Sequence, residues 1–180
     1  MQTKPSSFSI VLAGKWNPAI ITPPWILANL LEDNQQIEIE FSLSFDIPSR
    51  FKINNITISP SIDRIILVSN DGSDESLELI ELIAIKLCNI LSHTPLVAVG
   101  INFSFIETLN KELLLPLFTF SDANKLDDNN WEVSNQSIKR TLKKETYNIN
   151  LTINMDNETN VSLDFNHHYI AINSDKLSAC

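Results

Sequence analysis

The sequence predicts an α+β fold, in which one long helix at about residues 74–92 packs across one face of a twisted, mostly antiparallel sheet of about six or seven strands, with short accessory helices. Two patterns carry this prediction. Several short segments alternate apolar and polar residues, which is typical of half-buried strands. One longer segment instead has the spacing of an amphipathic helix. The 180 residues are enough for a substantial core, so we expect a single domain over residues 1–180.

The strands are expected wherever the alternation appears along the chain. The clearest segment is 37–46, where every second residue is Ile, Phe or Leu. Pro48 and Pro60 separate it from the next two segments at short spacing, which favours an antiparallel meander. Near the C-terminus, the turn sequence DNETN predicts a terminal hairpin at about 146–172. Further segments with the pattern are 7–13, 50–59, 61–69 and 95–105.

The long helix is predicted to begin at the turn SNDGSD, with Ser73 or Asp74 as its N-cap. Acidic residues in its first turn suit the positive end of the helix dipole. Its apolar residues fill a continuous arc of about half the circumference, which should face the sheet. Residues 121–135 should form a polar loop around Trp131. Shorter helices are expected at 23–31, 107–115 and 134–144.

The stretch GKWNPAIITPPWILANLL, residues 14–31, predicts a turn followed by a short helix. Thr22 takes the N-cap, and Pro23 and Pro24 occupy the first two helical positions, where a missing N–H is tolerated. We expect the Thr22 cap to contribute about 1 kcal/mol to stability. Trp16 is the residue of this stretch that could be exposed to a partner.

Charge and composition argue against several classes of partner. The formal net charge is −9, and arginine occurs at only three positions. Nucleic acids and anionic membranes need clustered Lys and Arg, so we expect neither as a partner, and no duplex DNA binding at physiological salt. Two cysteines do not make a disulfide framework, and the N-terminus lacks a signal-peptide pattern. These features favour a cytoplasmic location.

The common catalytic motifs are missing from the sequence. The three glycines are isolated, which disfavours a phosphate-binding loop and the cofactors it would hold. The three histidines are too few for a tight zinc site, and the missing motifs favour a protein without enzyme activity. One cluster could still bind a metal weakly or transfer a proton. It is SLDFNHHY, in which Asp164, Asn166 and His168 share the polar face of a strand. Cys88 lies at the edge of the apolar arc of the long helix and is expected in the core.

Protein–protein contact is the leading functional hypothesis. Leu82 and Ile85 fall within the polar stripe of the long helix, where a monomer should expose polar groups. We expect them to meet either a second copy of the chain about a two-fold axis, which we prefer, or the loop around Trp131. The sequence thus predicts a non-enzymatic, cytoplasmic protein-binding or assembly protein. Two alternatives stay open: a small enzyme or a ligand or metal binder that uses the Asp164/His168 face, and an acidic inhibitor of a nucleic-acid-binding protein.

Overall fold

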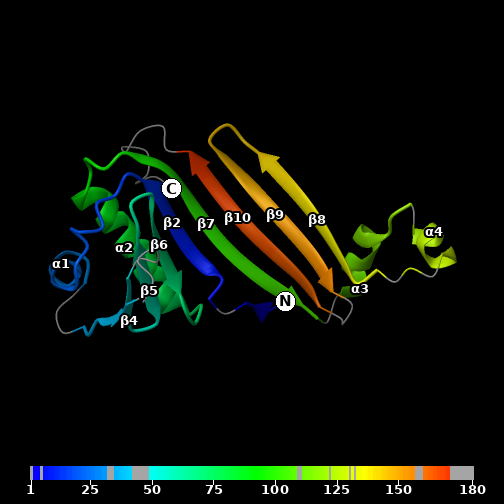
Figure 1. Cartoon of the computed structure of the whole chain (residues 1–180), viewed down its shortest axis with the longest axis horizontal. Helices are drawn as coiled ribbons and strands as arrows, with labels where there is room; N and C mark the ends of the chain where they lie inside the picture. The colour runs from blue at the N-terminus through cyan, green and yellow to red at the C-terminus, as the bar shows by residue number, and fades with distance from the viewer. Residues whose placement is uncertain are drawn as a thin grey trace.

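The protein is built around one ten-stranded sheet. The strands are β1 (Gln2–Thr3), β2 (Phe8–Gly14), β3 (Glu38–Glu40), β4 (Arg50–Ile53), β5 (Ile56–Pro60), β6 (Arg64–Ser69), β7 (Leu96–Glu107), β8 (Asn135–Lys143), β9 (Tyr147–Asp156) and β10 (Val161–Ile170). Their order is β3-β4-β5-β6-β2-β7-β10-β9-β8, with β1 paired to the end of β7, and all of these pairs are antiparallel (Figure 1). The structure is a computed structural model that describes residues 2–4, 6–31, 35–41, 49–108, 111–121, 123–129, 131, 133–156 and 160–170.

Helices lie toward the two ends of this sheet. They are α1 (Pro23–Asn29), α2 (Asp74–Ile90), α3 (Lys111–Leu114), the 3-10 helix η1 (Leu115–Phe118) and α4 (Ala123–Asp128). Helix α2 packs against β5, β6 and β2, whereas α3 and α4 lie at the opposite end of the molecule, next to β8 (Figure 1). None of the described helices has the length and apolar character needed to span a membrane.

The predicted fold class, a sheet of six or seven strands with one long helix packed across its face and short accessory helices, is wrong, although the antiparallel pairing of the strands is confirmed. The sheet has ten strands rather than six or seven, and the helix covers only β5, β6 and β2 instead of packing across the whole face. One reason is the segment 134–144, predicted as a helix, which forms the edge strand β8. The other is β7, whose twelve residues pair with β2 near one end and with β10 along most of their length. This strand carries the sheet well beyond α2.

Other predicted segments differ in extent from the elements observed. The predicted strand at 37–46 is described only to residue 41, where β3 spans Glu38–Glu40, and residues 42–48 lie outside the described residues. The predicted polar loop at 121–135 contains the short helix α4. Strand β9 pairs with β10 from Tyr147, opposite Tyr169, to Met155, opposite Val161. Residues 157–159 and 171–172 of the predicted hairpin lie outside the described residues.

The main core lies between α2 and the strands beneath it. Ile83 and Leu87 of α2 are fully buried against strand residues such as Leu12, Ile65 and Leu67. Burying each such aliphatic side chain stabilises the fold by about 1.5–3 kcal/mol. A second, smaller core lies beyond β7, where Phe118 of η1 packs on the far part of the sheet, and its other buried members are Ile153, Val161 and Leu163.

The start of α2 is fixed by a cluster of side-chain hydrogen bonds. Ser73 is the N-cap, and its Oγ accepts a hydrogen bond from the backbone N–H of Ser76 at 3.3 Å. The Asp71 carboxylate accepts hydrogen bonds from Ser76 Oγ at 2.7 Å, from the Ser73 backbone N–H at 3.1 Å and from Asn55 Nδ2 at 2.6 Å. These bonds, the Ser76 hydroxyl first, lower the pKa of Asp71 to about 2. They tie the helix to the β4–β5 turn.

The turn before α1 differs from the sequence prediction in one respect. Thr22 has the extended backbone of an N-cap and is followed by two prolines, but its side chain makes no capping hydrogen bond. Pro24 at the second helical position has no N–H to donate, which removes one of the two donors that a threonine cap can use. The predicted side-chain cap is therefore wrong, and the prolines and the backbone bond from Ile26 N to Thr22 O define this helix start.

Candidate protein-binding face of the sheet

Aromatic side chains line the part of the sheet beyond α2. Residues two apart on a strand share a face, and Leu12 and Val99, which belong to the core beneath α2, fix which face the helix covers. The same alternation along β7 and the strands paired with it puts a row of rings on that face. We call it the aromatic face, and its residues are Phe8, Phe103, Phe105, Tyr147, Phe165, His167 and Tyr169.

The rings of the aromatic face contact one another across strands. Phe103 of β7 stacks on Phe165 of β10, with ring centroids 5.1 Å apart, and the His167 ring is 5.3 Å from Phe103. Tyr147 and Tyr169 stack at 5.3 Å. Such pairs contribute about 0.5–1.5 kcal/mol each beyond simple burial, and they hold the rings in fixed orientations. The aromatic face is therefore arranged before any partner arrives.

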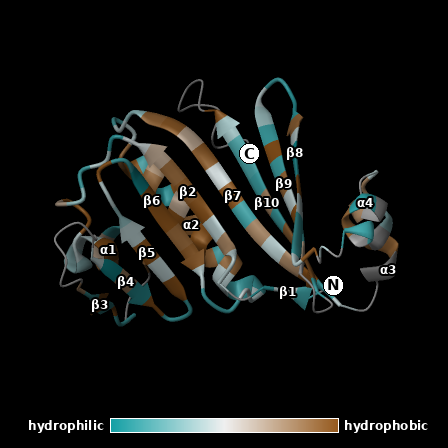
Figure 2. Cartoon of the chain, turned by 45° about the vertical axis from the view of Figure 1, so that its right-hand side comes forward, coloured by the Kyte–Doolittle hydropathy of each residue, from teal (hydrophilic) through white to brown (hydrophobic). Residues whose placement is uncertain are grey.

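The aromatic face remains accessible although it lies on central strands. Leu12 and Val99 are buried, whereas none of the seven residues of the aromatic face is. Two aliphatic side chains on the same face, Ile101 and Leu142, are 37% and 54% exposed. Among the described helices, α2 packs on one side of this region and η1 packs at its far end. The rings between them are left partly exposed to solvent, over a part of the sheet where apolar and polar positions alternate (Figure 2).

The opposite face of the same strands is polar and internally hydrogen-bonded. One row of side chains crosses five neighbouring strands, from β8 to β2. Thr141 Oγ1 donates to Asn150 Oδ1 at 2.9 Å, Asn150 Nδ2 donates to Asn166 Oδ1 at 3.0 Å, Asn166 Nδ2 donates to Asn102 Oδ1, and Asn102 Nδ2 donates to Ser9 Oγ at 3.0 Å. We call this the asparagine row. Each residue donates to the next, so the row links the two halves of the sheet.

The Asp164/His168 face does not bring its two chemical groups together. Both side chains lie on the polar face, as predicted, but four strand residues separate their Cα atoms by about 13 Å at 3.3 Å per residue. Asp164 Oδ2 accepts a hydrogen bond from Asn154 Nδ2 at 3.2 Å. His168 is paired in register with Asn148 and Gly100. Among the described residues, no group of three His, Cys, Asp or Glu side chains could hold a metal ion.

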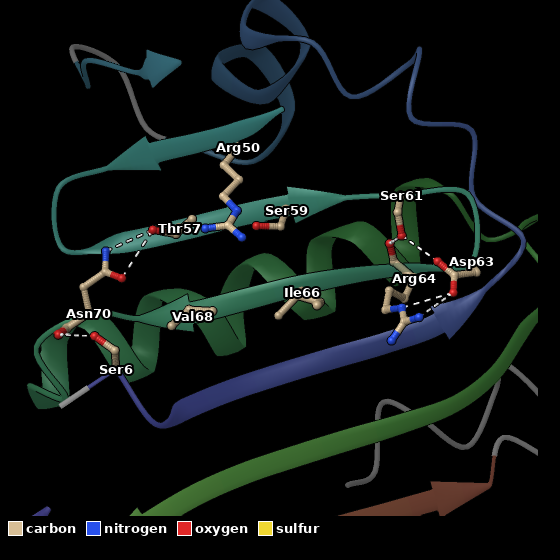
Figure 3. Close-up of a pocket in the computed structure, with 10 residues that line it drawn as sticks. All are labelled: Ser6, Arg50, Thr57, Ser59, Ser61, Asp63, Arg64, Ile66, Val68 and Asn70. Atoms are coloured by element: carbon tan, nitrogen blue, oxygen red, sulfur yellow. Dashed lines mark hydrogen bonds and ion pairs between the residues drawn. The ribbon is translucent and has the colours of Figure 1, made fainter. Parts of the chain in front are cut away.

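A shallow groove of about 610 Å³ lies on the polar face near β4, β5 and β6 (Figure 3). Arg50 extends across it toward Ser59, while Arg64 is held by Asp63 at 2.8 Å. At the other end, Thr57 and Asn70 hydrogen-bond to each other at 3.1 Å. Most polar groups of the groove thus already have partners within the protein. The groove has mixed charge and no converging set of free donors that would define a ligand.

The residues predicted for protein contact fall in different environments. Leu82 and Ile85 on α2 are 43% and 44% exposed, and Trp131 is 69% exposed. Trp131 follows α4, which lies at the opposite end of the molecule from α2, so this segment does not cover the two helix residues (Figure 1). Trp16 is only 6% exposed, and its Nε1 donates to the Leu12 carbonyl at 2.8 Å. The expectation that Trp16 is exposed is wrong, because its polar atom finds a partner inside the core.

Cys88 is a partly buried residue of the main core. Burial raises the pKa of its thiol, because desolvation disfavours the thiolate. A thiol with a raised pKa is a weaker nucleophile at neutral pH, since the thiolate is the reactive form. This environment suits the packing role expected from the sequence.

No protein-family model, curated protein or solved structure matches this chain. The candidate site therefore rests on the geometry of the chain itself. Sequence reasoning assigned the strands that carry Phe103 and Phe165 but did not recognise the aromatic face. The available signal was the run of aromatic residues at every second position in two separate strand segments, NFSF and DFNHHY.

Proposed function

We propose that the chain is a non-enzymatic, cytoplasmic protein-binding or assembly protein that acts through the aromatic face. The observation that carries the proposal is a preformed cluster of rings on central strands that no described helix buries. The rings are only partly buried by the chain itself, and contiguous apolar surface left in contact with water marks contact surfaces in soluble proteins. Aromatic side chains are also enriched where partners bind, because they supply large contact area at low entropy cost.

The alternative functions have less support. An enzyme or metal site at Asp164 and His168 would need the two groups within a few ångströms of a common atom, and the strand geometry separates them by about 13 Å. An acidic inhibitor would present the exposed carboxylates of α2, but this alternative gives no role to the aromatic face. The cytoplasmic location rests on composition and on the free thiol of Cys88.

A peptide-display selection tests the proposed function. The wild-type chain is immobilised at low density, so that two copies cannot pair, and a library of random peptides is selected against it. We expect enriched peptides rich in aromatic and aliphatic residues. Phe103→Thr should weaken their binding at least tenfold, which corresponds to about 1.4 kcal/mol, because it removes the central ring while keeping a residue that favours strands.

Two results would contradict the proposed function. One is no enrichment of peptides on the wild-type chain. The other is equal weakening by Phe103→Thr and by the control Thr152→Ala, which changes the opposite face of β9. The melting temperatures of both variants are measured alongside, and Phe103→Tyr, which keeps the ring, should retain binding. If Phe103→Tyr binds the peptides and Phe103→Thr does not, the loss of binding is due to the missing ring and not to a change in the fold.

A further inference from the structure

We infer that the occupant of the aromatic face is a second copy of this chain, packed about a two-fold axis that runs along the strands through the centre of that face. The inference rests on the proposed function, because it names the partner of the same surface. Two sheets that pack face to face lie about 10 Å apart, which lets the rings of one copy contact those of the other directly. Two-fold pairs are the commonest assemblies of identical chains.

The charges on the two sides of the aromatic face are complementary. Helix α2 carries four acids, Asp74, Glu75, Glu78 and Glu81, all exposed. Its one base, Lys86, donates to the Leu30 carbonyl at 3.0 Å, on the side toward α1. Strand β8, at the outer edge of the sheet, carries no acid and three exposed bases: Arg140 lies on the aromatic face, and Lys139 and Lys143 lie on the polar face. Within the described part of the chain, none of these four acids and three bases is in an ion pair.

The two-fold arrangement brings these charges together twice. The helix α2 lies on one side of the aromatic face and β8 on the other (Figure 1). A rotation about an axis between them carries α2 of one copy to the β8 edge of its partner, and the reverse contact follows by symmetry. The acidic helix of each copy then lies beside the basic edge strand of its partner. A partner that lacked a basic edge would leave the acids of α2 unmatched.

The edge position of β8 gives a second, independent reason for the two-fold pair. This strand ends the sheet, so its outer backbone N–H and C=O groups face away from β9. Exposed edge strands are prone to uncontrolled pairing, and proteins protect them with charged residues or by covering them with another element. In the two-fold pair, α2 of the partner covers this nine-residue edge. One arrangement therefore buries the aromatic face, pairs the charges and covers the edge.

A charge-exchange experiment tests this arrangement with the full chain. One variant reverses the charges of the edge strand (Lys139→Glu, Arg140→Glu, Lys143→Glu). Another variant reverses the charges of the helix (Glu75→Lys, Glu78→Lys, Glu81→Lys). All six side chains are exposed, so folding should be retained, which circular dichroism checks. By light scattering at about 50 µM, we expect the wild type at twice the 20.3 kDa chain mass, each variant alone as a monomer, and an equimolar mixture of the two variants as a dimer.

The outcomes separate this inference from the proposed function. A monomeric wild type, or a variant mixture that stays monomeric, overturns the inference, while peptide binding that depends on Phe103 would still support the function. A Phe103→Thr variant that keeps the wild-type dimer mass would also overturn it, because the aromatic face would then lie outside the interface. We expect Phe103→Thr to weaken the dimer at least tenfold.

Discussion

Replacing Asn166 with alanine should weaken the link between the two halves of the sheet. Its side chain is the middle of the asparagine row: Oδ1 accepts from Asn150 Nδ2 at 3.0 Å, and Nδ2 donates to Asn102 Oδ1. The row continues from Asn102 to Ser9 of β2, the strand that packs beneath α2. Alanine removes both bonds of Asn166 and leaves an acceptor and a donor of its neighbours without their partners.

The size of the effect follows from the number of bonds and their exposure. A side-chain hydrogen bond contributes about 0.5–1.5 kcal/mol net, so two bonds give about 1–3 kcal/mol. Asn150 is exposed and water can replace its lost partner, which favours the lower part of that range, about 1–2 kcal/mol. For a chain of this length, the melting temperature should then fall by roughly 2–8 °C.

Urea unfolding followed by circular dichroism measures the change in free energy. Asn148→Ala is the matched control, because Asn148 lies on the same face of β9 and makes no side-chain hydrogen bond among the described residues. We expect Asn148→Ala to change stability by less than about 0.5 kcal/mol. Equal losses in the two variants would refute the structural role of the row. A double-mutant cycle between Asn150 and Asn166 should in addition give a favourable coupling energy.

Three further substitutions test features that position the sheet and α2. Thr22→Val should change stability by less than about 0.5 kcal/mol, because the Thr22 side chain makes no cap bond; a loss near 1 kcal/mol in urea unfolding would restore the cap. Asp71→Asn should lower the melting temperature at pH 7. The pKa of Asp71 is depressed to about 2, so its stabilisation is present above about pH 4 and lost as the pH falls through 2. A difference in melting temperature between wild type and variant that stays constant down to pH 2 contradicts this. Gly14→Ala should destabilise by about 1–3 kcal/mol, because the new Cβ would lie 2.7 Å from the Pro95 carbonyl oxygen, whereas Gly100→Ala, with its nearest contact at 3.6 Å, should be tolerated in the same assay.

The sequence located most strands but not the size of the sheet. Alternation was sufficient where large apolar residues occupy every second position, as in β2, β6 and β9. It failed for β8, where only Ile138 and Leu142 are apolar and Gln136 and Arg140 fill the other positions of the same face. An edge strand with one neighbour needs few apolar residues, so its pattern resembles that of an exposed helix.

The candidate site could be predicted only in part. Alternation correctly assigns His167 and His168 to opposite faces of β10, and it puts Phe103 and Phe105 on one face of β7. It cannot show which face a helix covers or where the cover ends. The extent of the covered face depends on the strand order and on the length of α2. In that order, β2 lies between β6 and β7, and β7 continues beyond the helix. The Asp164/His168 hypothesis used only the shared face, which the register confirms but which does not specify the distance of about 13 Å along the strand.

The two halves of the sheet are stabilised in different ways, and this difference explains where a partner can act. Beneath α2, strand side chains such as Ile65 and Leu67 are fully buried by the chain's own helix. Beyond β7, the polar face relies on side-chain hydrogen bonds between strands, and the other face relies on contacts between rings and on the smaller core beneath Phe118. Ring contacts within one layer leave the outer surface of each ring in water, so a second layer would add burial at about 25 cal/mol per Å² without rearranging the first. The half of the sheet that α2 does not cover is therefore the half that gains most from binding.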